Sequence, residues 1–268
     1  MSSSQVVFVT GVSSGIGRAA AVRFAQRGCT VFGSIRDARK AEAIPGVELV
    51  EMDVRDATSV KRAVDTIVAK AQRIDVLVNN AGGTMVGSVE ETSVAEAQAL
   101  FDTNLFGILR TIQAVLPHMR QQRSGRIINV SSVLGFLPAP YMGLYSASKH
   151  AVEGLSESLD HEVRHFGIRV VLVEPSYTKT HFDLNAPQAA NPIGAYDADR
   201  ERVSKAVVQS VRKAPAPDGV AATIVEAASS AWAMRRTPKG EASLLRKLRR
   251  FMPAGPVDAS LRKTFGLG

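Results

Sequence analysis

Tyr145 and Lys149 lie four residues apart in the stretch GLYSASKHAVEG, so on a helix their side chains share one face. A free tyrosine has a pKa of about 10, which is too high for efficient proton exchange near neutrality. A neighbouring ammonium favours the phenolate and lowers that pKa, so the tyrosine becomes a workable general acid or base. Ser132 follows an apolar strand-like run, where its hydroxyl can hydrogen-bond a substrate oxygen. The pattern predicts proton transfer to a carbonyl oxygen or from an alcohol.

A second chemical motif follows on the same predicted helix. Residues His161-Glu162-Val163-Arg164-His165 fit H-E-x-x-H, the pattern of a helical zinc site with a built-in general base. At about 1.5 Å per helical residue, the two histidines lie about 18–24 Å beyond Lys149, toward the opposite edge of the sheet. No third ligand is evident in the sequence. We therefore predict no metal site, and a zinc hydrolase stays a minor alternative.

A glycine-rich turn occupies residues 10–17, Thr10-Gly11-Val12-Ser13-Ser14-Gly15-Ile16-Gly17. It joins the first strand-like run to the first helical stretch. Glycines permit a tight turn and let the backbone approach a pyrophosphate, and the helix N-terminus adds oriented N–H donors. The turn is predicted to bind phosphate groups.

The hydrophobic pattern predicts the scaffold that positions these residues. Short, β-rich apolar runs alternate with helical stretches, which indicates an α/β fold: a doubly wound, Rossmann-like parallel sheet with helices on both faces. Strands are predicted at 5–10, 30–35, 47–51, 74–79, 125–131 and 168–173. Helices are predicted near 15–27, 56–71, 93–122, 144–166 and 197–213. Residues 1–268 are interpreted as one domain, whose ligands bind beyond the carboxyl ends of the strands.

The turn has the spacing T-G-x-x-x-G-x-G, and here the sequence resembles the compact, single-domain branch of the short-chain dehydrogenase/reductase family. Further family motifs follow in the family's order: Asp53-Val54, Asn79-Asn80-Ala81-Gly82, Asn104, Ser132 and Tyr145-x-x-x-Lys149. The resemblance runs from about residue 5 to 180. It implies an oxidoreductase in which a nicotinamide cofactor supplies the hydride.

The resemblance also implies roles for individual residues. Asn104, Ser132, Tyr145 and Lys149 would form the catalytic set, with Lys149 on the cofactor ribose and Asn104 holding a water that links Lys149 to solvent. The expected cofactor-binding residues are Gly11, Ser13, Ser14, Gly15, Ile16, Gly17, Arg36, Asp53, Val54, Asn80, Ala81, Gly82, Tyr145, Lys149, Pro175, Thr178 and Thr180.

The end of the second predicted strand favours NADP(H) over NAD(H). NAD-preferring relatives have an acidic residue there, whereas this chain has Ile35 followed by Arg36. The planar guanidinium of an arginine pairs with the oxygens of a ribose 2′-phosphate, and Ser13 lies where it can add a hydroxyl contact. The alternative is that Arg36 is a solvated turn residue beside Asp37.

One segment departs from the family's pattern. Pro175 and Thr180 keep their places after the sixth strand, but Ser176 replaces the usual glycine. A side chain with a Cβ resists positive φ. The path of this loop beside the nicotinamide therefore stays open.

Substrate specificity is expected in a loop at about 181–196, a turn at 83–90, residues 133–142 and the C-terminal segment. These segments are rich in Met, Leu, Phe and Pro, which favours an apolar ketone or alcohol of steroid-, retinoid- or aromatic-like character. The expected partners are this small molecule and further copies of the chain, as a homo-dimer or homo-tetramer. A cofactor-binding sensor or scaffold without turnover is the alternative function.

Charge and cysteine content indicate the cellular location and the kinds of partner to expect. The single cysteine, Cys29, excludes an intrachain disulfide, and MSSSQVVFVTG lacks the features of a secretory signal, so a cytoplasmic location is expected. The net charge of +8 is concentrated in residues 231–268, where nine Lys and Arg stand against two acidic residues. No recognised nucleic-acid-binding module accompanies this charge, and we predict no nucleic-acid partner.

The basic extension at about 237–268 contains a predicted amphipathic helix at 241–253. Its apolar face carries Leu244, Leu245, Leu248, Phe251 and Met252, with Arg246, Lys247, Arg249 and Arg250 largely opposite. We expect the apolar face to dock against the protein; contact with an anionic membrane is possible in principle but not favoured.

Overall fold

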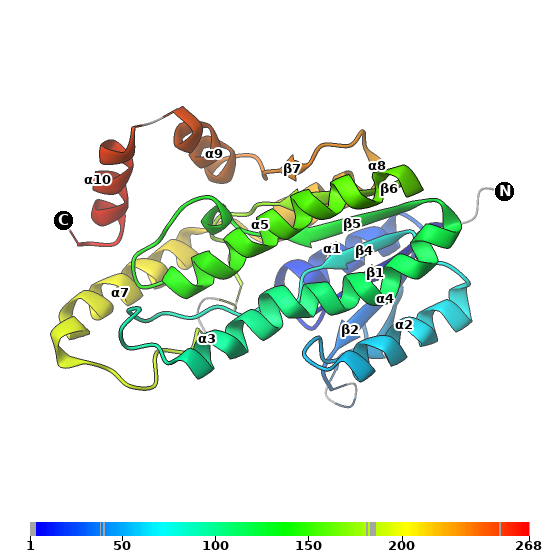
Figure 1. Ribbon diagram of the computed structural model, residues 1–268, viewed down its shortest axis with the longest axis horizontal. Helices are drawn as coiled ribbons and strands as arrows, with labels where there is room; N and C mark the ends of the chain where they lie inside the picture. Colours follow the sequence, from blue (N-terminus) through cyan, green and yellow to red (C-terminus); the bar gives the residue numbers. More distant parts are fainter. Residues whose placement is uncertain are drawn as a thin grey trace.

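Seven parallel strands form one sheet in the computed structural model (Figure 1). The structure describes residues 4–37, 39, 41–180, 182, 186–251 and 253–267. The strands are β1 (Val6–Val9), β2 (Thr30–Ile35), β3 (Val47–Glu51), β4 (Val76–Asn79), β5 (Gly125–Val130), β6 (Ile168–Val173) and β7 (Arg235–Arg236). Their order is β3-β2-β1-β4-β5-β6-β7, so the direction of winding reverses between β1 and β4. The predicted doubly wound α/β fold is confirmed.

The sequence predicted six of these strands and missed β7. This strand is two arginines long, without the apolar run that marks the others. It pairs with the end of β6 through Leu172 and Val173.

The described helices are α1 (Gly15–Gln26), α2 (Ala57–Ala71), α3 (Val94–Phe101), α4 (Gly107–Gln122), α5 (Gly143–Val163), α7 (Asp197–Lys213), α8 (Asp218–Ser229), α9 (Glu241–Phe251) and α10 (Ala254–Thr264). The stretch predicted as one helix at 93–122 contains a π-helical turn, Asp102–Phe106, between α3 and α4. Such turns widen a helix locally and are frequent at functional sites. Asn104 lies within this one.

Helices cover both faces of the sheet. On one face, α2, α4 and α5 bury Ile67, Ile112 and Val152 against strand residues such as Phe8 and Leu77. On the other face, α1 and α8 pack against the strand side chains of opposite orientation. Because both faces are covered, the strands are nearly all apolar, as the sequence indicated.

A buried chain of polar side chains crosses the first of these interfaces. Thr111 of α4 donates to Asn79 Oδ1 at 2.6 Å, and Asn79 Nδ2 donates to Asn129 Oδ1 at 2.9 Å. Asn129 Nδ2 then donates to Ser156 Oγ of α5 at 2.8 Å. All four residues are buried. Satisfied buried hydrogen bonds of this kind fix one arrangement of helix on sheet, here that of α5 on β4 and β5.

The C-terminal extension lies against the carboxyl-end loops of the sheet. Ala242 of α9 is 2% exposed, whereas Leu244 is 56% and Leu248 is 41% exposed. The helix therefore docks, but not through the whole apolar face: the expectation is wrong for Leu244 and Leu248. Met252 lies outside the described residues, as does the side chain of Phe251. None of the helices that the structure describes has the length and apolarity needed to cross a bilayer.

Replacing Asn129 by alanine should lower the free energy of unfolding by about 3 kcal/mol, because Asn79 Nδ2 loses its acceptor and Ser156 its donor inside the core. Urea unfolding followed by far-UV circular dichroism measures this. The control is Asn191→Ala on the exposed loop, which should change stability by less than about 0.5 kcal/mol. Equal effects of the two substitutions would contradict a structural role for the polar chain.

Candidate active site

The glycine-rich turn after β1 is fastened to the turn after β4. Thr10 Oγ1 accepts hydrogen bonds from the backbone N–H groups of Asn80 and Ala81 at 3.0 and 2.9 Å. The side-chain amide of Asn80 donates in return to the carbonyls of Thr10 and Gly11, both at 3.0 Å. The loops that follow β1 and β4 therefore form one unit at the switch point of the sheet, where doubly wound sheets bind ligands.

Gly17 is required by this close approach. A Cβ on Gly17 would lie 2.3 Å from both Asn80 Nδ2 and the carbonyl oxygen of Gly11. Gly11 and Gly15 have φ of +72° and +61°, which side chains with a Cβ rarely adopt. A Cβ on Gly15 would lie 3.2 Å from Thr180 Cγ2, so the loop after β6 reaches the same turn.

The N-terminus of α1 points its free N–H groups out of this turn. Ser14 is the N-cap residue, with no side-chain capping bond among the described residues, and the first turn carries no acidic residue. Ser13 and Ser14 are exposed. The partial positive charge of the helix end is thus available to an anion, and the turn fits the pyrophosphate of a dinucleotide.

Tyr145 and Lys149 lie in the first two turns of α5, both buried, with Lys149 Nζ 5.7 Å from the centre of the Tyr145 ring. Lys149 Nζ donates to the carbonyl of Val130, the last residue of β5, at 3.0 Å. Burial lowers the pKa of Lys149 to about 8, opposed by the negative charge of Glu153. A buried ammonium thus stands beside the phenol.

Ser132 lies just after β5 and caps the short helix Val133–Gly135, accepting from the N–H of Leu134 at 3.1 Å. Because this contact uses its oxygen as the acceptor, its own proton remains available for donation. The N–H of Val133 donates to the carbonyl of Pro175 at 2.9 Å, which ties the loop after β5 to the loop after β6.

Asn104 links the turn after β4 to α5. Its Oδ1 accepts from the N–H of Gly83 at 2.7 Å, and its Nδ2 donates to the Gly83 carbonyl at 2.9 Å and to Ser148 Oγ at 3.0 Å. Ser148 Oγ donates to the carbonyl of Tyr145 at 2.7 Å. A Cβ on Gly82 would lie 3.2 Å from Asn104 Oδ1 and 3.9 Å from Lys149 Nζ, so the structure brings these groups together. No pattern in the sequence points to Ser148 beyond its place between Tyr145 and Lys149.

The residues expected at the adenosine end follow β2 and β3. Arg36 is exposed directly after β2. Asp53 is held by Arg55, whose hydrogen bond is the main cause that lowers the pKa of the Asp53 carboxyl; Arg36 adds a smaller electrostatic contribution. Val54 is buried, with its side chain 2.9 Å from the position of a Cβ on Gly107. Ile16 is half-buried against the core under α1.

Apolar side chains surround the other side of Tyr145. Its ring lies 6.2 Å from the ring of Phe182, centre to centre. The buried cluster that contains it comprises Met85, Val86, Leu100, Ala139, Met142, Tyr145, Ala189, Val203, Val207, Val211 and Phe265. It draws on the turn near 83–90, the segment 133–142, α7 and the chain after α10. The sequence predicts contributions from 83–90, 133–142, the 181–196 loop, which supplies Ala189, and the C-terminal segment, which supplies Phe265; it misses the contribution of α7.

Acidic residues anchor the described part of the expected substrate loop; residues 181 and 183–185 lie outside the described residues. The fully buried carboxylate of Glu91 accepts from the N–H of Ile193 at 2.8 Å and pairs with Arg200. Glu96 accepts from the N–H of Ala190 at 2.9 Å. Burial raises the pKa of Glu91, but these hydrogen bonds outweigh it and hold that pKa below its ordinary value. The loop is fixed along 190–193.

Ser176 introduces no backbone strain. The non-glycine residues with positive φ among those described are Gln72, Arg123 and Tyr141. Ser176 therefore keeps an ordinary backbone conformation. Pro175 and Thr178 are buried, and Thr178 Oγ1 donates to the Ser176 carbonyl at 3.1 Å.

The H-E-x-x-H motif straddles the C-terminal end of α5. His161 and Glu162 are in the last turn and His165 is in the following 3₁₀ turn, and all three side chains are exposed. No group of three His, Cys, Asp or Glu is placed to hold a metal ion within the described ranges.

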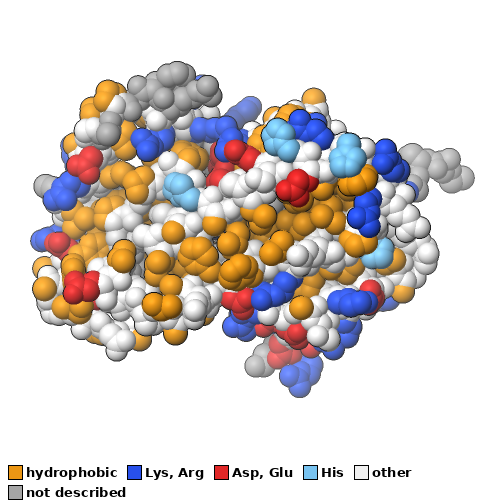
Figure 2. Space-filling view, in the orientation of Figure 1, with side chains coloured by type: hydrophobic (Ala, Val, Ile, Leu, Met, Phe, Trp, Pro, Cys, Tyr) orange, Lys and Arg blue, Asp and Glu red, His pale blue; other side chains and the backbone are white. Residues whose placement is uncertain are grey.

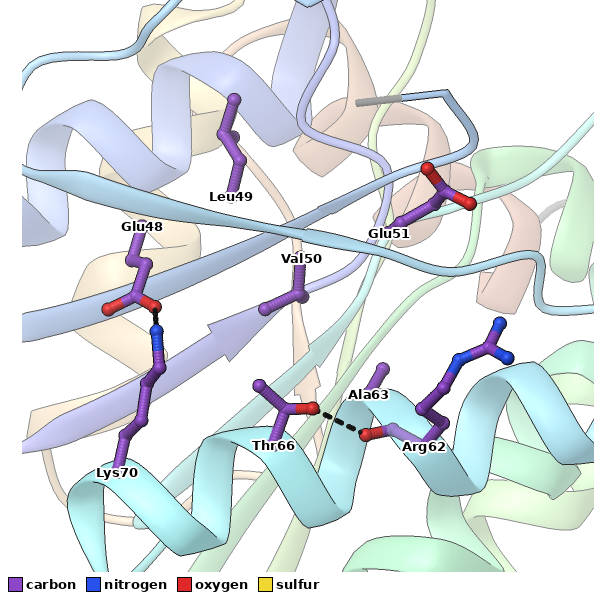
Figure 3. Close-up of a pocket in the computed structure, with 8 residues that line it drawn as sticks. All are labelled: Glu48, Leu49, Val50, Glu51, Arg62, Ala63, Thr66 and Lys70. Carbon is purple, nitrogen blue, oxygen red and sulfur yellow. Dashed lines mark hydrogen bonds and ion pairs between the residues drawn. The ribbon is translucent and has the colours of Figure 1, made fainter. Parts of the chain in front are cut away.

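A groove between β3 and α2 lies apart from these residues (Figure 3). Lys70 of α2 pairs with Glu48 of β3 across it, and Thr66 donates to the carbonyl of Arg62. The eight residues that line it include none of the predicted site residues. The groove lies at the β3 edge of the sheet, and the Lys70 ammonium in it is already paired with the Glu48 carboxylate.

A model of a family described as "short chain dehydrogenase" matches residues 5–191. The chain belongs to the short-chain dehydrogenase/reductase family. The chain is similar to two named oxidoreductases. A 3-ketodihydrosphingosine reductase of Bacteroides thetaiotaomicron is 42% identical over 68% of this chain and 66% of that enzyme. Human retinol dehydrogenase 8 is 37% identical over 67% of this chain and 60% of that protein.

Solved structures share the fold along most of the chain. A short-chain dehydrogenase from Streptomyces avermitilis is 34% identical with a TM-score of 0.84, covering 98% of this chain and 96% of that one. A relative from Burkholderia phymatum in complex with NAD is 27% identical, with a TM-score of 0.77 and 92% of each chain covered. One from Burkholderia cenocepacia with NADP is 24% identical, with a TM-score of 0.78 and 96% and 97% covered, and shows the fold alone. The relatives include proteins with either cofactor.

Replacing Gly17 by alanine should weaken NADPH binding by about tenfold or more, since the new Cβ must displace the Gly11 carbonyl or the Asn80 amide. Fluorescence titration with NADPH measures it. The matched control is Gly154→Ala on α5, where a Cβ meets nothing within 4 Å, and which should stabilise the protein by about 0.5–1 kcal/mol. Unchanged NADPH affinity in the Gly17 variant would contradict this location of the phosphate site.

Proposed function

We propose that this short-chain dehydrogenase transfers a hydride between NADP(H) and an apolar carbonyl compound or secondary alcohol. The observation that carries the proposal is the buried Lys149 ammonium, 5.7 Å from the centre of the Tyr145 ring and hydrogen-bonded to the carbonyl of Val130, two residues before Ser132. Few structural roles call for an ammonium held this way, because burial of a charge is costly.

The turn fits the proposed cofactor. Its glycines leave no room for Cβ atoms, and the exposed N-terminus of α1 offers donors to a pyrophosphate. The phosphates would be held by Gly11, Ser13, Ser14, Gly15, Ile16 and Gly17, and the adenine by Asp53 and Val54. The ribose and the nicotinamide ring would be held by Asn80, Ala81, Gly82, Tyr145 and Lys149. The carboxamide would be held by Pro175, Thr178 and Thr180. When bound, the cofactor supplies or accepts the hydride.

The chain's own residues move the proton. In reduction, Ser132 donates a hydrogen bond to the carbonyl oxygen and Tyr145 gives that oxygen its proton; in oxidation, Tyr145 removes the proton of the alcohol. Lys149 favours the phenolate electrostatically, so that the tyrosine exchanges its proton near neutrality. Asn104 and Ser148 hold the first turn of α5 against Gly83 and thereby keep Tyr145 in register with Ser132. A water held at Asn104 as the link to solvent remains a prediction.

An apolar substrate is favoured by the side chains around Tyr145. Phe182, Met85, Met142 and Leu100 belong to or border this surface. The names of the two enzyme relatives, a ketodihydrosphingosine reductase and a retinol dehydrogenase, support a lipophilic carbonyl or alcohol. A sensor or scaffold without turnover is less well supported, since such a protein does not need a tyrosine whose pKa is lowered by a neighbouring ammonium.

Assembly as a homo-dimer or homo-tetramer is also proposed. Figure 2 shows apolar side chains gathered in a band over α4 and α5. Phe106, the residue directly before α4, is 46% exposed, and Leu105 and, on α5, Leu155 are half-buried. Contiguous apolar surface of this kind is characteristic of interfaces. A cytoplasmic location rests on the single, unpaired Cys29.

The substitution Tyr145→Phe should reduce the turnover of NADPH with any accepted ketone about 10²–10⁴-fold, because the proton donor is removed while the ring stays. A panel of steroid, retinoid, aromatic and aliphatic carbonyls, followed by NADPH absorbance, identifies the substrate first. NADPH affinity should fall far less than turnover, because Tyr145 is one of many proposed cofactor contacts, and it serves as the control. Retained turnover would overturn the proposed mechanism.

The substitution Arg36→Ala should lower the ratio of kcat/KM with NADPH to that with NADH about tenfold to hundredfold, since a charged contact to the 2′-phosphate is lost. Arg39→Ala is the matched control, because Arg39 is an exposed arginine of the same turn that pairs with Asp37. A wild-type preference for NADH over NADPH would contradict the assignment of NADP(H).

A further inference from the structure

Residues 186–193, called the wall below, belong to the described part of the expected substrate loop. Ala189 of the wall is buried in the same apolar cluster as Val86 and Tyr145. The backbone joins the wall to the turn after β4, since the N–H of Val86 donates to the carbonyl of Pro187 at 3.1 Å. The wall is therefore part of the apolar surroundings of the tyrosine.

The carboxylate of Glu91 fastens the far end of the wall. Its Oε1 accepts from the N–H of Ile193 at 2.8 Å, and its Oε2 accepts from the N–H of Ser88 at 3.2 Å. Arg200, in the first turn of α7, pairs with Oε1. The side chain of Glu91 has no exposed surface, and that of Arg200 is 14% exposed. One buried carboxylate thus joins three segments: the turn before α3, the wall and α7.

Burial makes this junction sensitive to any displacement of the wall. A carboxylate held out of water is costly unless its charge is balanced and its oxygens accept hydrogen bonds. Here a guanidinium balances the charge, and a backbone N–H occupies each oxygen. Moving Ile193 away takes one donor from the buried charge of Glu91. The wall is therefore held in one position before any substrate binds.

The same ion pair ties the wall to the helix that packs in the apolar cluster. Arg200 precedes Val203 and Val207 on α7, and both valines are buried in the cluster that contains Tyr145. The wall also has a second anchor, because Glu96 accepts from the N–H of Ala190 at 2.9 Å. Glu91 differs from Glu96 in joining the wall to α7 as well as to the turn before α3.

We propose that Glu91, paired with Arg200, is a specificity-determining positioning residue: it holds residues 186–193 as a preformed wall against which large apolar carbonyl substrates bind. The inference rests on the proposed function and adds to it how a large substrate is selected over a small one. A small carbonyl compound held by Ser132 and Tyr145 does not need the wall.

The effect of removing the anchor follows from how often the wall holds its fixed position. A site that is competent for about one-tenth of the time binds its ligand about tenfold more weakly. Once a large substrate is bound, it keeps the wall in place, and proton transfer at Tyr145 proceeds as before. Loss of the anchor therefore raises the KM of a large substrate and leaves kcat nearly constant.

The test is steady-state reduction at saturating NADPH by the full-length Glu91→Gln protein. The probes are the largest and the smallest carbonyl compounds of the panel that the wild-type protein reduces. A glutamine does not balance the charge of Arg200, and its NH₂ group faces a backbone donor. The KM of the largest compound should rise about tenfold, while its kcat and the KM of the smallest compound should stay within about threefold.

Glu201→Gln is the matched control. Glu201 is the neighbour of Arg200 on α7, is exposed, and pairs with Lys205 of the same helix. The substitution removes the same charge from the same region, and the KM of both compounds should be unchanged. If Glu91→Gln does not fold, Arg200→Gln provides the test, because it leaves Glu91 its backbone donors; it should raise the KM of the largest compound in the same way.

Two results would overturn the proposal. The first is an unchanged KM of the largest compound in the variant that provides the test, since the wall then does not depend on the Glu91–Arg200 pair. The second is a loss of kcat, or a rise of KM, that is equal for the two compounds, since a general disturbance of the site acts on both alike.

Failure of the proposed function is visible separately. A wild-type protein that reduces none of the panel refutes the function, and hydrogen exchange of the Ala190 and Ile193 amides in the cofactor-free protein then decides the role of Glu91. Exchange that is slow in the wild type and in Glu201→Gln, and about tenfold faster in Glu91→Gln, supports the anchor. Equal exchange in the three proteins refutes it.

Discussion

A lysine ammonium held out of water is the constraint on which the site depends. Lowering the pKa of Lys149 from 10.5 to about 8 corresponds to about 3 kcal/mol of destabilisation of its charged form. That cost is limited by a hydrogen bond to the last carbonyl of β5 and by the negative charge of Glu153 one helical turn away. Lys149 is held by α5, by β5 and by the turn at Gly82, which follows β4. The buried polar chain through Asn79 of β4 and Asn129 of β5 fixes these same elements together.

Hydrogen bonds and close contacts join the loops after β1, β4, β5 and β6 at the edge of the sheet where Lys149 lies. The turn after β1 is bound to the turn after β4 by Thr10 and Asn80, and the loops after β5 and β6 are joined between Val133 and Pro175. Close approach at Gly15 brings Thr180 to the first turn. Parallel strands deliver their carboxyl ends to a single edge, so these contacts convert sequence-distant motifs into one rigid rim.

Local pattern was enough to predict six strands, the five principal helices and the motifs of the site, because apolar runs, glycine turns and Tyr-x-x-x-Lys are short-range signals. What it missed depends on pairing across the chain. Two arginines gave no sign of being strand β7, the π turn at Asn104 broke a stretch with uniform helical pattern, and Glu174 looked like any residue before a proline. The sequence predicts that Leu244 and Leu248 of α9 pack against the protein, but both side chains are exposed. The ion pair of Arg246 with buried Glu174 decides which side of that helix faces the protein.

The most direct test of the account is the ionisation of Tyr145 itself, measured by ultraviolet difference titration with oxidised cofactor bound and with the Tyr145→Phe protein as the blank. If Lys149 tunes the phenol, Tyr145 should ionise at least about one pH unit below the ordinary value near 10, and Lys149→Met should return the transition to that value or above it. A wild-type transition near pH 10, or one that Lys149→Met leaves in place, would contradict the central claim.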